Sequence, residues 1–154
     1  MDAGEKYFED WTVGERLETA SATLDEAQII EFARAYDPQT FHLDPKLARE
    51  SIFGGLVASG WQTIAVVMRL LIDSGAFGSH GAVGLGIDGL RWLKPVRPGD
   101  SIRAVAEAIA VRVSADSSKG VVHVKITTKN QDDEDVMTHT AIILLPCRPV
   151  RVTR

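Results

Sequence analysis

The order of apolar and polar positions divides the chain into a helical first half and a second half of strands. Residues 23–26, TLDE, form a capping-box pattern, in which the threonine caps the first turn of a helix and the glutamate reaches back to it. Apolar residues then recur at helical spacing as far as Tyr36. We expect this helix to end at Asp37, because Pro38 pushes the residue before it out of the helical conformation.

A second helix is predicted after the glycine-rich segment 54–60. Ser59 and Gln62 form a second capping-box pattern, and residues 73–75, DSG, provide a helix end. Valine and leucine residues flank an apolar stripe, so most of the circumference is apolar and the helix should be buried nearly all round. The stripe consists of Trp61, Ile64, Ala65, Met68, Leu71 and Ile72.

The second half of the chain contains four runs with the pattern of β-strands. These runs cover residues 85–93, 102–113, 120–129 and 136–145. A turn and two polar loops join them, and the third run alternates most regularly between apolar and polar positions. Helices followed by closely connected strands predict an α+β domain with an antiparallel sheet. The pattern fits a sheet that curls round the second helix, and equally a helix that lies across an open sheet.

Composition and length are those of an ordinary globular protein. The 154 residues, of which 45% are hydrophobic and 25% charged, fit one domain over residues 1–154 with its core at about 8–147. The longest apolar run, residues 61–72, is too short to span a bilayer and is interrupted by Arg69, so no membrane association is expected. The N-terminal sequence lacks an export signal, and we therefore expect a cytoplasmic protein.

Charge and histidine placement limit the kinds of partner. The chain has 17 Lys and Arg against 21 Asp and Glu, a net charge of −4, which argues against wide contact with nucleic acid. A small anionic ligand can still bind locally. His80, His123 and His139 lie in no grouping with cysteines or carboxylates that is typical of a metal site, so no metal is expected.

Asp37 and His42 are the first candidates for chemistry. They lie five residues apart in a proline-bounded loop. If the loop folds back, both side chains can face one water or substrate atom, so that one accepts a proton while the other donates one. Spacing alone does not decide this, because an aspartate after a helix and a histidine in a loop commonly have structural roles.

The loop that holds this pair resembles the hydratase signature of MaoC-like enzymes, in which an aspartate and a histidine at this spacing are catalytic. Three further segments resemble the family, namely 8–14 (FEDWTVG), 53–60 (FGGLVASG) and 93–100 (LKPVRPGD). The resemblance runs from about residue 8 to the last strand. It departs at Gln39-Thr40, where the family commonly has Asn-Pro, but the spacing between the aspartate and the histidine is kept.

The resemblance implies a single hot-dog domain, an antiparallel curled sheet wrapped around a long central apolar helix. One curled sheet leaves an edge strand exposed, and members of this family typically pair such edges. We therefore expect a homodimer or a dimer of dimers.

The resemblance also implies a hydro-lyase of fatty acid metabolism, an (R)-specific enoyl-CoA hydratase or dehydratase. Asp37 would take a proton from water as its oxygen attacks C3 of a trans-2-enoyl thioester, and His42 would donate a proton toward C2. The substrate is an acyl-CoA thioester, and no cofactor is expected beyond the coenzyme A that it carries. A hot-dog acyl-CoA thioesterase and a non-catalytic acyl-CoA-binding module are the alternatives.

Gly60 is the candidate for stabilising the negative charge that develops on the thioester oxygen. If Ser59 is the N-cap, the Gly60 N–H has no partner within the helix and lies at the positive end of the helix dipole. The missing Cβ would let a thioester approach closely. Further substrate-binding candidates are Ser59, Trp61 and Met68 near the acyl group, and Arg91, Lys94 and Arg97 for the phosphates of coenzyme A.

Overall fold

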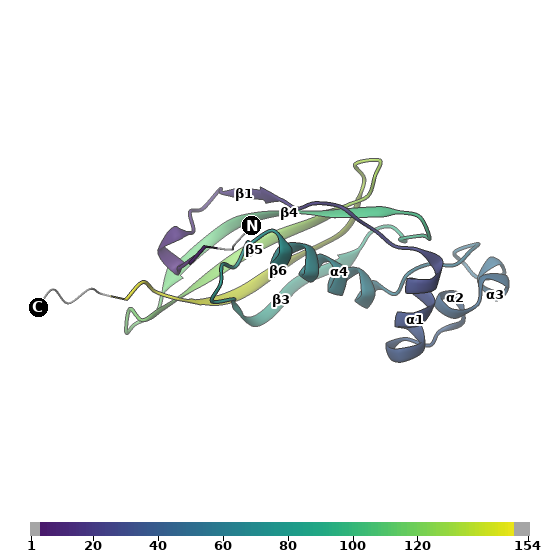
Figure 1. Ribbon diagram of the computed structural model, residues 1–154, viewed down its shortest axis with the longest axis horizontal. Coiled ribbons are helices and arrows are strands. Elements are labelled where there is room, and N and C mark those ends of the chain that lie inside the picture. Colours follow the sequence, from purple (N-terminus) through teal and green to yellow (C-terminus); the bar gives the residue numbers. More distant parts are fainter. Residues whose placement is uncertain (1–3, 150–154) are drawn as a thin grey trace, which may run out of the picture.

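A six-stranded antiparallel sheet curls around helix α4 (Gly60–Asp73). Helices α1 (Glu26–Tyr36), α2 (Thr40–Leu43) and α3 (Pro45–Arg49) gather near the N-terminal end of α4 (Figure 1). The computed structural model describes residues 4–149. The strands are ordered β1-β4-β5-β6-β3, and β2 also pairs with β4. The predicted hot-dog fold is confirmed, because the sheet wraps the helix instead of lying open beneath it.

The four predicted strands are present, with bounds that lie within two residues of those expected. They are β3 (Val83–Trp92), β4 (Ser101–Val113), β5 (Lys119–Lys129) and β6 (Asp135–Pro146). Two short strands were not predicted, because two or three residues are too few to show an alternation. The remaining elements are η1 (Phe8–Asp10), β1 (Arg16–Glu18), β2 (Ala22–Thr23), α1 (Glu26–Tyr36), α2 (Thr40–Leu43) and α3 (Pro45–Arg49).

The predicted start of α1 is wrong by two residues. The N-cap is Asp25, whose carboxylate accepts from the backbone N–H of Gln28 at 2.8 Å, while the Gln28 side chain accepts from the Asp25 N–H at 3.0 Å. Thr23 lies in β2, and its hydroxyl is 2.5 Å from the Ser101 hydroxyl. Two overlapping capping patterns are present in the sequence, and the pairing of β2 with β4 determines which one is used.

Helix α4 begins and ends where the sequence indicates. Ser59 is its N-cap and accepts from the Trp61 N–H at 3.3 Å, and Gly75, in the left-handed conformation with φ of 74°, follows its last turn. Gln62 does not complete the predicted capping box. Its amide group donates instead to the backbone carbonyl of Gln28 at 3.0 Å, which ties α4 to α1.

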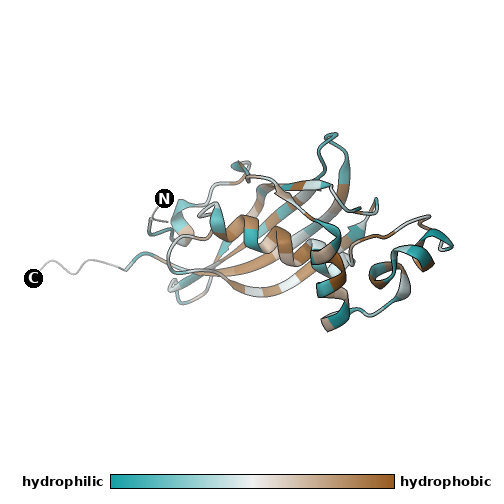
Figure 2. Ribbon diagram, turned by 45° about the vertical axis from the view of Figure 1, so that its right-hand side comes forward, coloured by the Kyte–Doolittle hydropathy of each residue, from teal (hydrophilic) through white to brown (hydrophobic). Residues whose placement is uncertain are grey.

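The prediction that α4 is buried nearly all round is wrong for the single chain. Val67 and Leu71 are almost fully buried, whereas Trp61, Met68 and Ile72 are 56%, 52% and 51% exposed. Figure 2 shows hydrophobic residues along α4 and along the sheet behind it. The helix therefore buries one face against its own sheet and leaves part of its apolar surface uncovered.

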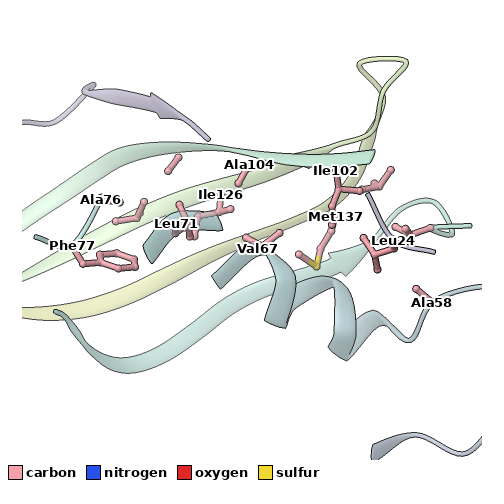
Figure 3. Close-up of a cluster of buried hydrophobic side chains, with 14 of the residues drawn as sticks. Leu24, Ala58, Val67, Leu71, Ala76, Phe77, Ile102, Ala104, Ile126 and Met137 are labelled. Carbon is pink, nitrogen blue, oxygen red and sulfur yellow. The ribbon is translucent and has the colours of Figure 1, made fainter. Parts of the chain in front are cut away.

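The core lies between α4 and the concave face of the sheet. Val67 and Leu71 point from the helix toward Ala104, Ile126 and Met137 of the sheet (Figure 3). The regular alternation of β5 is confirmed, since Val122, Val124 and Ile126 are all buried. Among the described residues, no helix combines the length and hydrophobicity that crossing a membrane requires.

Candidate active site

The loop after α1 brings Asp37 and His42 together. Asp37 is the C-cap of α1 and His42 lies in α2, and the loop between them folds back through hydrogen bonds from the Gln39 N–H to the Asp37 carbonyl (2.8 Å) and from the His42 N–H to the Gln39 carbonyl (3.0 Å). As a result, His42 Nε2 lies 3.2 Å from Asp37 Oδ2. Both side chains are largely buried, with 7% and 16% of the histidine and aspartate exposed.

A backbone carbonyl fixes the orientation of the His42 ring. Nδ1 lies 2.6 Å from the carbonyl oxygen of Val57. Since a carbonyl can only accept, Nδ1 carries a hydrogen and donates it to Val57. Nε2 is therefore the nitrogen that can exchange protons, and it is the one that faces Asp37.

Two donors hold the Asp37 carboxylate. The Ser59 hydroxyl donates to Oδ2 and the Gln39 amide donates to Oδ1, both at 2.7 Å. Burial raises the pKa of Asp37, but the hydrogen bonds from Ser59 and Gln39 and the charge of His42 outweigh it and lower the pKa below its ordinary value. Asp37 is therefore a carboxylate at neutral pH.

One proton can pass between His42 Nε2 and Asp37 Oδ2. When Nε2 is protonated, it can donate to Oδ2 directly. When Nε2 is deprotonated, its lone pair and the Asp37 carboxylate are both hydrogen-bond acceptors. A water molecule can then donate one hydrogen to each of them. This arrangement is suited to a reaction in which one group gives a proton and the other takes one.

Ser59 connects this pair to the start of α4. Its hydroxyl donates to Asp37 and accepts from the Trp61 N–H, so one side chain caps the helix and holds the carboxylate. Gly60 is the first residue of α4, and the N–H at that position has no partner within a helix. The sequence suggested Ser59 as a substrate-binding residue, but its side chain is fully buried and donates its one hydroxyl hydrogen to Asp37.

The missing Cβ of Gly60 makes room for an indole ring, a reason for this glycine that the sequence did not indicate. A Cβ at this position would lie 2.4 Å from both Cε2 and Nε1 of Trp92. Trp92 is the last residue of β3, beyond an irregularity in the pairing of β3 with β6 where Gly89 has φ of 60°. The sequence did not identify Trp92 as a neighbour of Gly60, because a strand pattern does not show where a bulge redirects a side chain.

A pocket of about 420 Å³ opens beside the pair. Its wall is mainly aromatic and aliphatic, with Asp37, His42 and Gly60 as part of the lining. The aromatic residues of the wall are Phe41, Phe53, Trp61 and Trp92. Trp61 and Trp92 pack edge to face with ring centroids 5.4 Å apart. An apolar pocket with a few converging polar groups is the usual form of a site for a small organic ligand.

The family model described as MaoC like domain matches residues 9–130 of the chain. The chain belongs to this family. The matched segment contains the Asp37–His42 loop, the start of α4 and three of the long strands, so it includes every residue of the pocket lining except Val136.

Proteins with similar sequence or structure carry related names. The structure of the MaoC-like dehydratase from Rhodospirillum rubrum has a TM-score of 0.90 and 39% identity, covering 95% of this chain and 100% of that one. 3-Hydroxyacyl-thioester dehydratase Z from Mycobacterium tuberculosis is 30% identical, over 82% of this chain and 77% of that protein. Protein MaoC from Klebsiella aerogenes is 37% identical over 64% of this chain, which corresponds to 29% of its own length.

The three basic residues expected to bind coenzyme A lie on the surface near the turn that follows β3. Each forms a hydrogen bond or ion pair within the chain. Lys94 lines the pocket and forms an ion pair with Glu134. Arg97 donates to the Phe53 carbonyl at 2.7 Å and so fixes the segment before α4. Arg91 donates to the carbonyl of its neighbour Leu90 at 2.9 Å.

The remaining candidates are divided between two places. Trp61 lines the pocket beside Asp37, whereas Met68 lies further along α4, where it lines a second cavity. Within residues 4–149, no three His, Cys, Asp or Glu side chains come together as a set of metal ligands. The structure therefore places Asp37, His42, Gly60 and Trp61 on the wall of one pocket and separates Met68 from them, while Ser59 is buried and contacts the site through its hydrogen bond to Asp37.

Proposed function

We propose that the chain catalyses the reversible hydration of trans-2-enoyl-CoA, or in reverse the dehydration of (R)-3-hydroxyacyl-CoA. The observation that carries this proposal is the placement of His42 Nε2 and Asp37 Oδ2 3.2 Å apart on the wall of an apolar pocket. Family membership and the dehydratase named above support the same class of reaction.

The proposed hydration needs one water held by the pair. Asp37 accepts a proton from the water as its oxygen bonds to C3, and His42, with hydrogens on both nitrogens, donates from Nε2 to C2. The C3–O and C2–H bonds form while the C2=C3 π bond breaks. Asp37 is then protonated and Nε2 bare, and the proton can pass from Oδ2 to Nε2 over the 3.2 Å between them, which restores the starting state.

The start of α4 would stabilise the charge that develops on the thioester oxygen. Gly60 offers an N–H without a helical partner, at the positive end of a helix of 14 residues. The indole of Trp92 packs against Gly60 on one side, so the thioester would approach the N–H from the pocket side of the backbone. A donor fixed in advance costs no reorganisation when the charge appears.

The coenzyme A part of the substrate would leave the pocket past the turn after β3. Lys94 lines the pocket, and Arg91 and Arg97 lie close by in sequence on the same exposed segment. We propose that these cations meet the phosphates, with Lys94 exchanging Glu134 for a phosphate oxygen.

The proposed active form is a cytoplasmic homodimer formed through β3. This strand is at the edge of the sheet, and Val83, Leu85 and Ile87 on it are 60%, 54% and 51% exposed. Leu85 and Ile87 line the same cavity as Met68, which belongs to the uncovered apolar side of α4 together with Ile72. A second copy of the chain can pair with the β3 edge and cover these residues.

A crotonyl-CoA assay separates this function from its two alternatives. A hydratase removes the absorbance of the enoyl thioester without releasing a thiol. An acyl-CoA thioesterase releases free coenzyme A and leaves that absorbance in place. A binding module retains crotonyl-CoA and changes neither signal, and either of these two results would contradict the proposal.

A further inference from the structure

A second cavity, of about 360 Å³, lies further along α4. It is formed between the helix and strands β3 and β6, in the part of the core where Figure 3 shows Val67, Leu71 and Phe77 beside Ile126. Every side chain on its wall is apolar except that of His139. No lysine, arginine or carboxylate belongs to the lining.

His139 is a polar side chain in surroundings that provide no partner for it. It lies on β6 opposite Ile126 of β5 and is 7% exposed. Its Nδ1 is buried and has no hydrogen-bond partner among residues 4–149. Burial lowers the pKa of the His139 imidazole, which is therefore neutral at physiological pH. A leucine would fill the same space without leaving a polar atom unsatisfied, so packing does not account for a histidine.

Both cavities are lined by residues of α4 and β6. Thr63 of α4 lines the pocket that holds Asp37 and His42, and its neighbour Ile64 lines the second cavity. On β6, Val136 lines the first and His139 the second. Three residues of a strand span roughly 10 Å. His139 therefore lies about that distance along β6 from Val136 on the wall of the first pocket, a separation that a medium-length acyl chain can cover.

We infer that the cavity takes the distal part of the acyl chain and that His139 selects chains with a neutral oxygen, a hydroxyl or a ketone, near that end. This inference rests on the proposed function. An imidazole without charge can donate to or accept from such an oxygen. A terminal carboxylate is disfavoured, because the lining offers no cation to replace its hydration.

The test compares trans-2-decenoyl-CoA with its ω-hydroxy analogue on wild type, His139→Leu and His123→Leu. Wild type should prefer the hydroxylated substrate in kcat/KM by roughly 10-fold, the usual worth of one neutral hydrogen bond. His139→Leu should lose or reverse this preference. His123 lies on β5 outside the cavity lining, so His123→Leu is the matched control and should keep the preference.

Three outcomes would overturn the inference. Wild type could show no preference, His139→Leu could retain it, or His139→Leu could alter self-association and leave selectivity unchanged, which would make a second copy of the chain the partner of His139. Failure of the proposed function is recognised separately, as a wild type that does not hydrate crotonyl-CoA. In that case calorimetric binding of the two decenoyl thioesters tests the same preference without turnover.

Discussion

The two cavities along α4 differ in how their polar side chains are hydrogen-bonded. At the N-terminal end, Asp37 receives hydrogen bonds from Ser59 and Gln39, and His42 is fixed by Val57. Further along, His139 lies in an apolar wall, and its Nδ1 has no hydrogen-bond partner in the described part of the chain. Groups that do chemistry have to be oriented by the protein, whereas a group that recognises a ligand can leave its hydrogen bond for that ligand.

The largest effects should come from the oriented pair. Asp37→Asn and His42→Ala should each reduce hydration of crotonyl-CoA by about 10²- to 10⁴-fold, because each removes one proton-transfer group. The double variant should fall far short of the product of the two losses, since both groups act on one water. Steady-state kinetics with melting temperatures as a folding control measure this. Wild-type turnover in either single variant would exclude that residue from the mechanism.

The second-largest loss of activity should follow removal of the Gly60 N–H. The position of Trp92 determines which variants can test this. Any side chain at Gly60 meets the indole, so the substitutions belong in a Trp92→Ala background. There, Gly60→Pro deletes the N–H at a helix position that tolerates proline, and Ser59 already has the extended backbone that a following proline requires, with ψ of 138°. Gly60→Ala keeps the N–H and adds similar bulk.

In that background the proline variant should lose about 10²- to 10³-fold in kcat relative to the alanine variant, the usual cost of removing one oxyanion donor. Circular dichroism should be unchanged in both. Equal losses would mean that access, not hydrogen bonding, explains the glycine. Near-full turnover with proline would exclude the Gly60 N–H as a donor.

A further prediction concerns the proposed dimer interface, which includes residues of the distal cavity and lies apart from Asp37 and His42. Leu85 is half exposed and also lines the distal cavity, so Leu85→Lys places a charge on the apolar surface proposed as the dimer interface. It should weaken dimerisation by roughly 10²-fold because the charge loses its hydration in the interface. Val111→Lys, at an exposed position of β4 outside the cavity lining, is the control. Light scattering measures the mass. A wild type that is monomeric at micromolar concentration would contradict the dimer.

The sequence predicted the elements that repeat a local pattern and missed what depends on distant contacts. The four long strands and the N-cap Ser59 follow from periodicity and capping rules, and both are found. The start of α1 was misplaced because the pairing of Thr23 with β4 is not visible locally. The sequence did not predict the exposed side of α4, because an apolar pattern does not show whether the same chain or a second chain covers the helix.

The site was predictable in its chemistry but not in its supports. The spacing of Asp37 and His42, with the family resemblance, identified the pair that the structure brings together. The Val57 carbonyl that orients His42 and the Trp92 ring beside Gly60 come from segments far away in the sequence. His139 was set aside because no metal-like grouping surrounds it, and only the three-dimensional wall shows that it lines a cavity.

The smallest predicted effect sharpens the role of the donors to Asp37. Removing the Ser59 hydroxyl or the Gln39 amide should raise the pKa of Asp37, because each hydrogen bond favours the carboxylate. Hydration requires that carboxylate, so the acidic limb of the pH–rate profile should move to higher pH in Ser59→Ala and in Gln39→Ala.

The same two variants should change how stability depends on pH. Asp37 has a lowered pKa in the folded state, so its ionisation stabilises the folded state at neutral pH. This contribution is lost as pH falls through the pKa of Asp37 in the folded state. Both variants should therefore lose less stability on acidification than wild type.

The two variants differ in what else they remove, which makes each a control for the other. Ser59 also caps α4, so Ser59→Ala should cost about 1 kcal/mol of stability at neutral pH. Gln39 makes no side-chain capping bond to α2, so Gln39→Ala should move the acidic limb with little loss of stability. If Ser59→Ala lowers the melting temperature while the pH profile stays in place, the serine acts as a helix cap alone. If Gln39→Ala also leaves the profile unchanged, hydrogen bonding does not set the ionisation of Asp37.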